Sequence, residues 1–285
     1  MSQSCRFGGT ADDSENVILR SRARVVVVAN QKGGSGKTTV AINLAVGMIQ
    51  AGMSVASLDA DVNQESLTHF VENRTAWARL RVLDLPTPAH ERLSVPSSED
   101  PDAFLSRRLA ELSATHQAIV IDTAGHNDGL NRSIHARADV LVTPLNDSFV
   151  DLDVLARFDP ETLDVVRIGK YAEMVRELRG SRRDSGERDI EWIVVRNRLS
   201  AIDTRNKRHV GNSLSDLARL LDFRCAEGVG ERLIFREFFT KGLVPSMTDA
   251  GRAGCAADDV SSHGSGRNAG IVAGGAWKQR RGGAR

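Results

Sequence analysis

The stretch RVVVVANQKGGSGKTTVAINLA, residues 24–45, constrains the fold of this chain more than any other. Residues 25–29 form a continuous apolar run, mostly β-branched, which is typical of a strand buried on both faces of a sheet. Glycines follow, and a helical pattern then runs from Gly36 to about Gln50. A strand, a glycine-rich turn and a helix in this order let backbone amides surround a phosphate group. The stretch therefore predicts a phosphate-binding loop within an α/β domain.

Four further apolar runs predict the other strands of that domain, at residues 54–59, 118–122, 140–145 and 190–197. Helical patterns lie between them, for example at residues 102–116 and 203–222. Strands that alternate with helices imply crossover connections. We therefore expect the α/β fold of a P-loop NTPase, with a mostly parallel β-sheet and helices on both faces.

Composition divides the chain into three parts. Residues 1–23 are polar and lack periodicity, so we expect a flexible N-terminal arm. Residues 24–244 form the predicted α/β domain, which carries the phosphate-binding loop. Residues 245–285 are rich in Gly, Ala, Ser and Arg, which predicts a disordered tail.

Charge and apolar content limit the classes of function. The 38 basic and 37 acidic residues leave a net charge of +1, so binding to DNA requires a local basic patch. There is no run of about 18 apolar residues and no apolar signal-peptide core, so we expect a cytoplasmic protein that does not bind membranes. The three cysteines have no metal-ligand spacing, which argues against a zinc site or an iron–sulfur enzyme.

The loop supplies most of the candidate binding residues. Lys37 is placed to contact the β- and γ-phosphates of a nucleotide, the Thr38 hydroxyl to bind Mg²⁺, and Thr39 to reach the α-phosphate. The backbone of the preceding turn would surround the phosphates. That turn consists of Gly33, Gly34, Ser35 and Gly36.

Acidic residues follow two of the predicted strands. Asp59 and Asp61 come at the end of one, and Asp122 ends another, with Gly125 three residues later. Ligands of open α/β sheets bind at the carboxyl ends of strands, so these side chains are candidates for the site. An Asp after a strand also commonly caps the next helix, and Asp59 fits that alternative.

A second lysine, Lys32, begins the glycine turn, and the resulting stretch of residues 32–39, KGGSGKTT, resembles the deviant Walker A box of the ParA/MinD ATPases. The resemblance implies that Lys32 reaches the phosphates bound by a partner subunit. It also implies a water-positioning role for Asp61, a Walker B role in Mg²⁺ binding for Asp122, and a γ-phosphate contact for Gly125. Asn197 occupies the place of an adenine contact. The chain departs from the family at residue 124, where alanine replaces proline.

Within this group, the stretches RADVLVTPLNDSFVDLDVL, EWIVVRNRLSAIDTRNKR and ERLIFREFFTKGL resemble the MipZ ATPases over residues 24–244. The resemblance implies a slow regulatory ATPase that forms a homodimer with ATP. It further implies binding to ParB and to DNA without sequence preference, inhibition of FtsZ polymerisation, and positioning of the division plane. Such a protein is cytoplasmic, nucleoid-associated and enriched near the cell poles. A ParA-type chromosome or plasmid partition ATPase shares all of the nucleotide residues and is the alternative.

The DNA-binding prediction rests on one helical pattern and one short cluster. Apolar residues at positions 210, 214, 217 and 221 share one helix face, which places Arg205, Arg208 and Arg219 roughly opposite. Arg232 and Arg236 form a second basic group. Exposed helix faces are usually charged without binding anything, so the residues alone leave both interpretations open. The family resemblance favours a DNA-binding patch.

Overall fold

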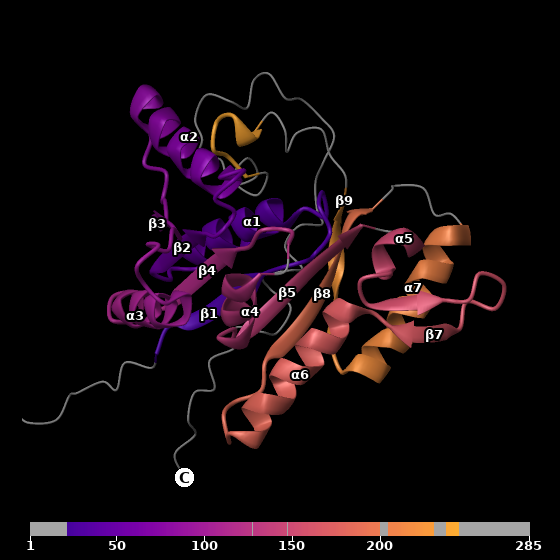
Figure 1. The fold of residues 1–285 in the computed structure, drawn as a ribbon. Helices are drawn as coiled ribbons and strands as arrows, with labels where there is room; N and C mark the ends of the chain where they lie inside the picture. The colour runs from indigo at the N-terminus through magenta and orange to yellow at the C-terminus, as the bar shows by residue number, and fades with distance from the viewer. Residues whose placement is uncertain (1–21, 127, 147, 200–204, 231–237, 245–285) are drawn as a thin grey trace, which may run out of the picture.

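Seven parallel strands form the central sheet of this protein, in the order β3-β2-β4-β1-β5-β8-β9. The structure is a computed structural model that describes residues 22–126, 128–146, 148–199, 205–230 and 238–244 (Figure 1). The strands of the sheet are β1 (Arg24–Val28), β2 (Val55–Asp59), β3 (Ala89–Arg92), β4 (Ala118–Asp122), β5 (Val140–Asn146), β8 (Glu191–Leu199) and β9 (Arg224–Gly230).

The five strands expected from the sequence are all present, and they form the centre of the sheet. β1, β2 and β4 consist almost entirely of buried residues, which explains their continuous apolar sequences. The two edge strands, β3 and β9, were not predicted. β3 reads AHER and has no fully buried residue, and β9 reads RCAEGVG, so neither shows an apolar run.

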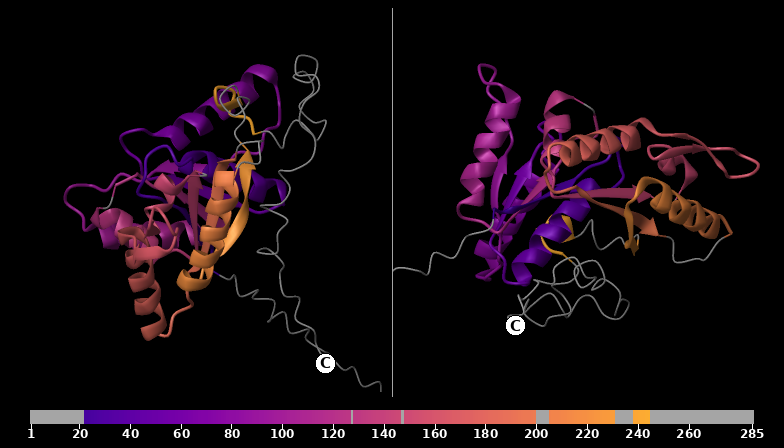
Figure 2. Two further views of the ribbon diagram at one scale, coloured as in Figure 1. Left: turned by 90° about the vertical axis from the view of Figure 1, so that its right-hand side faces the viewer. Right: turned by 90° about the horizontal axis from the view of Figure 1, so that it is seen from below.

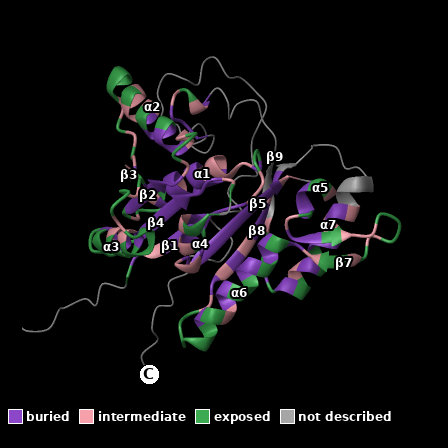
Figure 3. Cartoon of the chain, viewed as in Figure 1, coloured by how far each residue is buried: buried purple, intermediate pink, exposed green. Residues whose placement is uncertain are grey.

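Helices cover both faces of the sheet, as expected (Figure 2). α1 packs its apolar side chains on one face, while residues of α3, α4, α6 and α7 belong to the larger apolar cluster on the other. The buried positions follow the sheet and the inner sides of the helices (Figure 3). The helix bounds are α1 (Lys37–Gln50), α2 (Ser66–Arg81), α3 (Pro101–Ser113), α4 (Gly129–Ala136), α5 (Phe149–Leu152), α6 (Lys170–Asp184) and α7 (Arg205–Leu221).

A two-stranded antiparallel sheet stands apart from the main one. It consists of β6 (Ala156–Phe158) and β7 (Val165–Ile168), and it connects α5 to α6. The short helix α5 comes directly after β5 in the chain, at the end of the sheet where the glycine-rich loop also lies.

The segment 238–244 packs against α2. Arg74 of α2 is fully buried, and its guanidinium donates hydrogen bonds to the carbonyl oxygens of Gly242 (2.6 Å) and Pro86 (2.9 and 3.0 Å). A β-carbon at Gly242 would lie 2.2 Å from the Arg74 Cα, so only glycine allows the two backbones to approach this closely. Within the described residues, no helix has the length and apolarity that a membrane span requires.

Candidate functional site

The glycine-rich loop joins β1 to α1 and has the backbone conformation that its glycines predict. Gly36 caps the N-terminus of α1 with φ +90°, and Gly34 has φ +72°. A β-carbon at Gly36 would lie 1.8 Å from the side-chain nitrogen of Asn197. Any other residue at position 36 would therefore meet both an unfavourable backbone conformation and a steric clash.

Polar side chains that follow β1 and end β5 hold the loop in place. Asn30 donates from its amide nitrogen to the Pro144 carbonyl (2.7 Å) and accepts from the Lys32 backbone N–H (2.9 Å). Asn146 donates to the Gly34 carbonyl (3.4 Å). Hydrogen bonds within the chain thus fix the loop to the carboxyl end of β5, which lowers the ordering cost of ligand binding.

Lys37, the first residue of α1, lies where the loop and the residues after β4 meet. Its ammonium donates to the Lys32 carbonyl oxygen (3.3 Å), and a β-carbon at Gly125 would lie 3.4 Å from it. Burial lowers the pKa of Lys37, and the carboxylates of Asp122 and Asp61 oppose that change. The structure therefore brings together Lys37, Gly125 and both acidic residues that the sequence predicts to meet.

Asp122 ends β4 in a buried position and provides the best candidate for a metal ligand. Burial raises the pKa of its carboxyl to about 7, whereas a hydrogen bond with the Thr38 side chain acts to lower it. Within the described part of the chain, its Oδ1 atom is buried without a hydrogen-bond partner. An oxygen atom left in this state beside a threonine hydroxyl fits a hard cation such as Mg²⁺.

The described residues offer no cluster of three or more His, Cys, Asp or Glu side chains that could hold a metal by themselves.

Asp59 and Asp61 have different surroundings although they are two residues apart. The Asp59 carboxylate is buried and accepts hydrogen bonds from the Thr68 N–H and hydroxyl in the first turn of α2 (both 3.0 Å). Asp59 therefore satisfies a backbone N–H in the first turn of α2, although the N-cap residue of that helix is Glu65. Asp61 is partly exposed and accepts from the Gln64 N–H (3.1 Å), so its carboxylate is more accessible.

Lys32 lies at the mouth of the loop and contacts its own chain. Its ammonium donates to the Val150 carbonyl oxygen (2.9 Å) and forms an ion pair with Asp151, whose side chain is only 8% exposed. Ser148, the N-cap of α5, donates its hydroxyl to the other oxygen of Asp151 (3.1 Å). The unusual lysine is therefore held by α5 in this structure.

The remaining predicted nucleotide residues lie in or against the loop. Gly33 and Gly34 are exposed, Ser35 is buried, and Thr39 lies in the first turn of α1. Asn197 of β8 is buried, and its amide donates to the Ser35 carbonyl (2.9 Å). The amide also carries a second N–H and a carbonyl oxygen, and its contact with adenine stays a prediction.

The basic residues predicted to bind DNA can be located only in part. The core face of α7 is as expected, since residues 210, 214, 217 and 221 are buried. Arg219 is 82% exposed and pairs with Asp216 (3.2 Å), which offsets its charge locally. Arg205 and Arg208 lie in the first turn of α7, but their side chains are outside the described part of the structure. Arg232 and Arg236 also fall outside the described residues.

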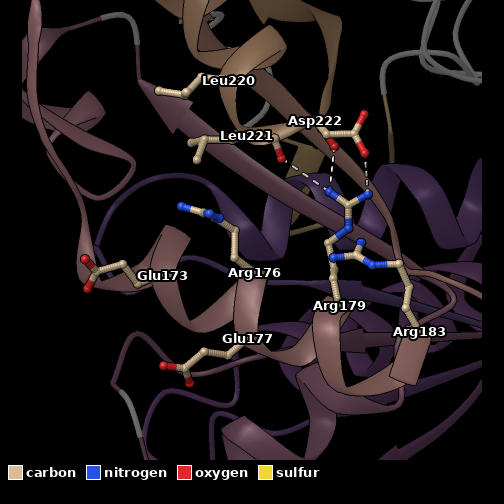
Figure 4. Close-up of a pocket in the computed structure, with 8 residues that line it drawn as sticks. All are labelled: Glu173, Arg176, Glu177, Arg179, Arg183, Leu220, Leu221 and Asp222. Atoms are coloured by element: carbon tan, nitrogen blue, oxygen red, sulfur yellow. Dashed lines mark hydrogen bonds and ion pairs between the residues drawn. The ribbon is translucent and has the colours of Figure 1, made fainter. Parts of the chain in front are cut away.

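A cavity of about 560 Å³ lies away from the loop, between α6 and the end of α7 (Figure 4). It is lined mainly by charged side chains of α6. The Arg179 guanidinium donates hydrogen bonds to the Leu221 carbonyl oxygen and to Asp222, so its donors are satisfied by the protein itself (Figure 4). None of the residues that line this cavity belongs to the loop or to the acidic strand ends.

Three residues of the site were missed by sequence reasoning: Asn30, Asn146 and Asp151. Their signal was present, because Asn30 lies beside the glycine turn and the other two lie in the stretch NDSFVDLD, residues 146–153. Without the fold, nothing placed that stretch against the loop. The structure gives it a physical account as the element that contacts Gly34 and Lys32.

Comparison with known sequences decides the family. The sequence model of the ATPase MipZ matches residues 24–267, which is most of the chain. The chain belongs to the MipZ ATPase family. The match runs past residue 244, where the sequence pattern had placed the end of the ATPase domain, into residues outside the described structure.

Curated relatives lie in the wider ParA/MinD group. The chain is 28% identical over 153 residues to the chromosome-partitioning ATPase Soj of Treponema pallidum, covering 46% of this chain and 60% of that protein. It is 30% identical over 152 residues to the septum site-determining protein MinD of Helicobacter pylori, covering 46% and 57%. A shorter match, 38% over 71 residues, is to an iron–sulfur cluster carrier protein of Mycobacterium tuberculosis, covering 25% and 19%. The chain thus spans less than two thirds of each of these relatives.

Solved structures confirm the fold of this MipZ family member. A complex of a single-residue variant of McdA from Cyanothece with ATP superposes with a TM-score of 0.58 at 17% identity, covering 80% of this chain and 90% of that one. The apo form of McdA gives a TM-score of 0.57 at 17% identity, covering 81% and 96%. The P-loop NTPase fold of the ParA/MinD type is therefore confirmed.

Proposed function

We propose that this MipZ family ATPase is a switch that binds ATP with Mg²⁺, forms a homodimer in that state, and returns to a monomer after slow hydrolysis. The observation that carries the proposal is the meeting of Lys37, Asp122, Asp61 and Gly125 around a loop that also holds a second lysine. An ordinary phosphate-binding loop requires Lys37 and does not require Lys32.

Binding of the nucleotide falls to the loop and to Lys37. The α1 N-terminus and the backbone amides of residues 33–36 attract the phosphates, and the Lys37 ammonium neutralises part of their charge. Its pKa is lowered by burial, and a nearby phosphate would favour its charged form again. Thr39 lies in the first turn of α1, where its hydroxyl would contact the α-phosphate.

Thr38 and Asp122 would hold Mg²⁺, since they supply a hydroxyl and an unsatisfied buried oxygen on the same side of the loop. When bound, this ion would offset the negative charge of the phosphates. Asp61 is the acidic side chain at the site with a more accessible carboxylate, so it is suited to orient a water molecule.

Dimer formation is the proposed consequence of ATP binding. Two nucleotides enclosed between subunits bring many negative charges into a poorly hydrated space. A lysine from each side offsets that charge, and its effect grows as charge develops during hydrolysis. Lys32 would supply this cation, once it leaves its ion pair with Asp151.

The proposed output is the positioning of the division plane. Monomers would associate with ParB near the cell poles, and dimers would bind DNA on the nucleoid and inhibit FtsZ polymerisation. The DNA contact would involve arginines 205, 208, 219, 232 and 236. Non-specific phosphate contacts weaken steeply with salt, so DNA binding measured at two salt concentrations tests that part separately.

Sedimentation of FtsZ polymers tests the division role. The protein is added with ATP or with ADP, and Asp61→Ala is used to hold the ATP-bound state. Loss of polymer with ATP alone supports the proposal. Polymer that persists in both nucleotides, with a chain that still dimerises, would point to the alternative of a ParA-type partition ATPase, which the similarity to Soj supports.

A further inference from the structure

A chain of hydrogen bonds leads from the edge strand β3 to Asp61, and its members are not part of the phosphate-binding loop. His90 of β3 is the register partner of Ser57 in β2, and the two side chains are hydrogen-bonded (Oγ to Nδ1, 2.9 Å). The other ring nitrogen of His90 lies 3.0 Å from the Thr68 hydroxyl of α2. Thr68 in turn contacts Asp59.

The direction of these hydrogen bonds follows from the Asp59 carboxylate. The Asp59 carboxylate can only accept, so the Thr68 hydroxyl uses its single hydrogen on Asp59 Oδ2 (3.0 Å). That hydroxyl must then accept from His90, which places the proton of the neutral ring on Nε2. Nδ1 is left to accept from the Ser57 hydroxyl. Burial lowers the pKa of His90, against the opposing charge of Asp59, so the neutral ring is favoured.

The chain ends at the backbone of Asp61. The second oxygen of Asp59, Oδ1, accepts the Asp61 N–H (3.1 Å). Thr68 fixes Oδ2 through both its hydroxyl and its N–H, so the Asp59 carboxylate has one orientation and presents Oδ1 to Asp61. Ser57, Asp59 and Thr68 are all buried, and water cannot readily replace these contacts.

We infer that His90 is a positioning residue for ATP hydrolysis, which acts through Thr68 and Asp59 to hold Asp61 where it orients the attacking water. The inference rests on the proposed function, because it assumes that Asp61 serves hydrolysis. A displacement of a reacting group by about 1 Å costs up to roughly a hundredfold in rate, so a partial loss of this support should lower turnover by about tenfold. Nucleotide binding should change little, because His90, Thr68 and Asp59 lie outside the loop.

The test compares three variants and one control by steady-state ATPase assay and by binding of a fluorescent ATP analogue. His90→Leu removes both ring nitrogens. His90→Gln keeps an N–H donor for Thr68, and Thr68→Val removes the hydroxyl at nearly constant volume. His69→Leu is the control, because His69 is the exposed residue next to Thr68 and lies outside the hydrogen-bond chain.

We expect His90→Leu and Thr68→Val to lower kcat by about tenfold with KM and analogue affinity within about twofold of the wild type. His90→Gln should recover most of the rate, and His69→Leu should leave it unchanged. The double variant His90→Leu/Thr68→Val should be no slower than Thr68→Val alone, because His90 acts through Thr68. If His90→Leu does not fold, as judged by its thermal melt, His90→Gln and Thr68→Val decide the question.

Asp61→Asn separates this inference from the proposed function. Wild-type turnover in His90→Leu and Thr68→Val, with loss in Asp61→Asn, would overturn the role of His90 alone. Wild-type turnover in Asp61→Asn would overturn the role of Asp61 and this inference with it. Equal loss of rate and of nucleotide affinity in His90→Leu and His90→Gln would also overturn it, because that pattern indicates general disruption of the site.

Discussion

Lys32 and Asp151 form an ion pair within one chain, and the Lys32 ammonium also donates to the Val150 carbonyl oxygen at 2.9 Å. The pair joins the start of the glycine-rich loop to α5. The same lysine is the residue proposed to reach the partner subunit. Its ammonium would pair either with Asp151 in the monomer or with the phosphates bound by the partner subunit in the dimer.

Asp151→Asn should therefore favour dimerisation. The substitution removes the carboxylate charge that pairs with Lys32. The ion pair stabilises this position of Lys32 by about 1 kcal/mol. Each dimer would release two such lysines, so the dissociation constant of the dimer should fall by about tenfold or more. Sedimentation velocity with a slowly hydrolysed ATP analogue measures this constant. Asp153→Asn is the control, because Asp153 lies in the same acidic stretch but is exposed. A dimer constant that is unchanged or weaker in Asp151→Asn would contradict a restraining role.

The two lysines of the loop should differ in what they support. Lys37→Ala should abolish nucleotide binding, because it removes the cation between the loop and Asp122. Lys32→Ala should retain analogue binding within about threefold but impair dimerisation and hydrolysis. Fluorescence titration and light scattering on the same samples separate these effects, with the exposed Lys170→Ala as control. Parallel loss of binding in both variants would remove the distinction between the two lysines.

His135 should make stability depend on pH below neutrality. It is buried in α4, its Nδ1 donates to the Asn131 carbonyl (2.6 Å), and burial lowers its pKa in the folded protein. The unfolded chain then binds more protons between the lowered pKa and the ordinary value of about 6.5. Stability from this group is complete above about pH 6.5 and is lost as the pH falls below it.

Urea denaturation at several pH values tests this, with His135→Gln as the comparison. His90 contributes in the same direction, so the difference between wild type and variant is the quantity to measure. That difference should shrink as the pH falls. A constant difference from about pH 5 to about pH 8 would show that His135 does not change its protonation on folding.

Arg179 should matter for stability and not for hydrolysis. It is buried, and it donates to Asp189 (2.9 Å), to Asp222 (2.8 Å) and to the Asp222 carbonyl oxygen (2.7 Å), which ties α6 to the end of α7. Arg179→Met should lower the free energy of unfolding by about 2–3 kcal/mol, since the partners lose a cation while Asp222 remains solvated. Arg183→Met, an exposed partner of the same Asp189, should cost less than about 1 kcal/mol. Similar costs for the two variants would show that burial of Arg179 adds nothing.

Sequence reasoning located the centre of the fold and the centre of the site for the same reason. Parallel central strands are buried on both faces and therefore read as apolar runs, and the acidic residues that end them are easily seen. The edge strand β3 was not predicted because its four residues are polar or exposed and form no apolar run. The role of His90, which lies on β3, was not predicted either, because a single histidine indicates no function until its partners in β2 and α2 are known.

Contacts between segments that are distant in the chain also could not be predicted from the sequence. Asp151 follows Lys32 by more than a hundred residues, and only the parallel order of β1 and β5 brings them together. A contact of Asp59 with the start of α2 was expected as an alternative because that helix follows β2 along the chain, whereas the contact of residues 146–153 with the loop was not expected.

The most direct test of the account is sedimentation velocity of Asp61→Ala with ATP and with ADP. The account predicts a dimer with ATP and a monomer with ADP, because the variant binds nucleotide but does not hydrolyse it. Addition of Lys32→Ala to the same chain should return the ATP form to a monomer. A monomer in both nucleotides, with ATP binding intact, would contradict the proposal that this protein is a nucleotide-controlled dimer.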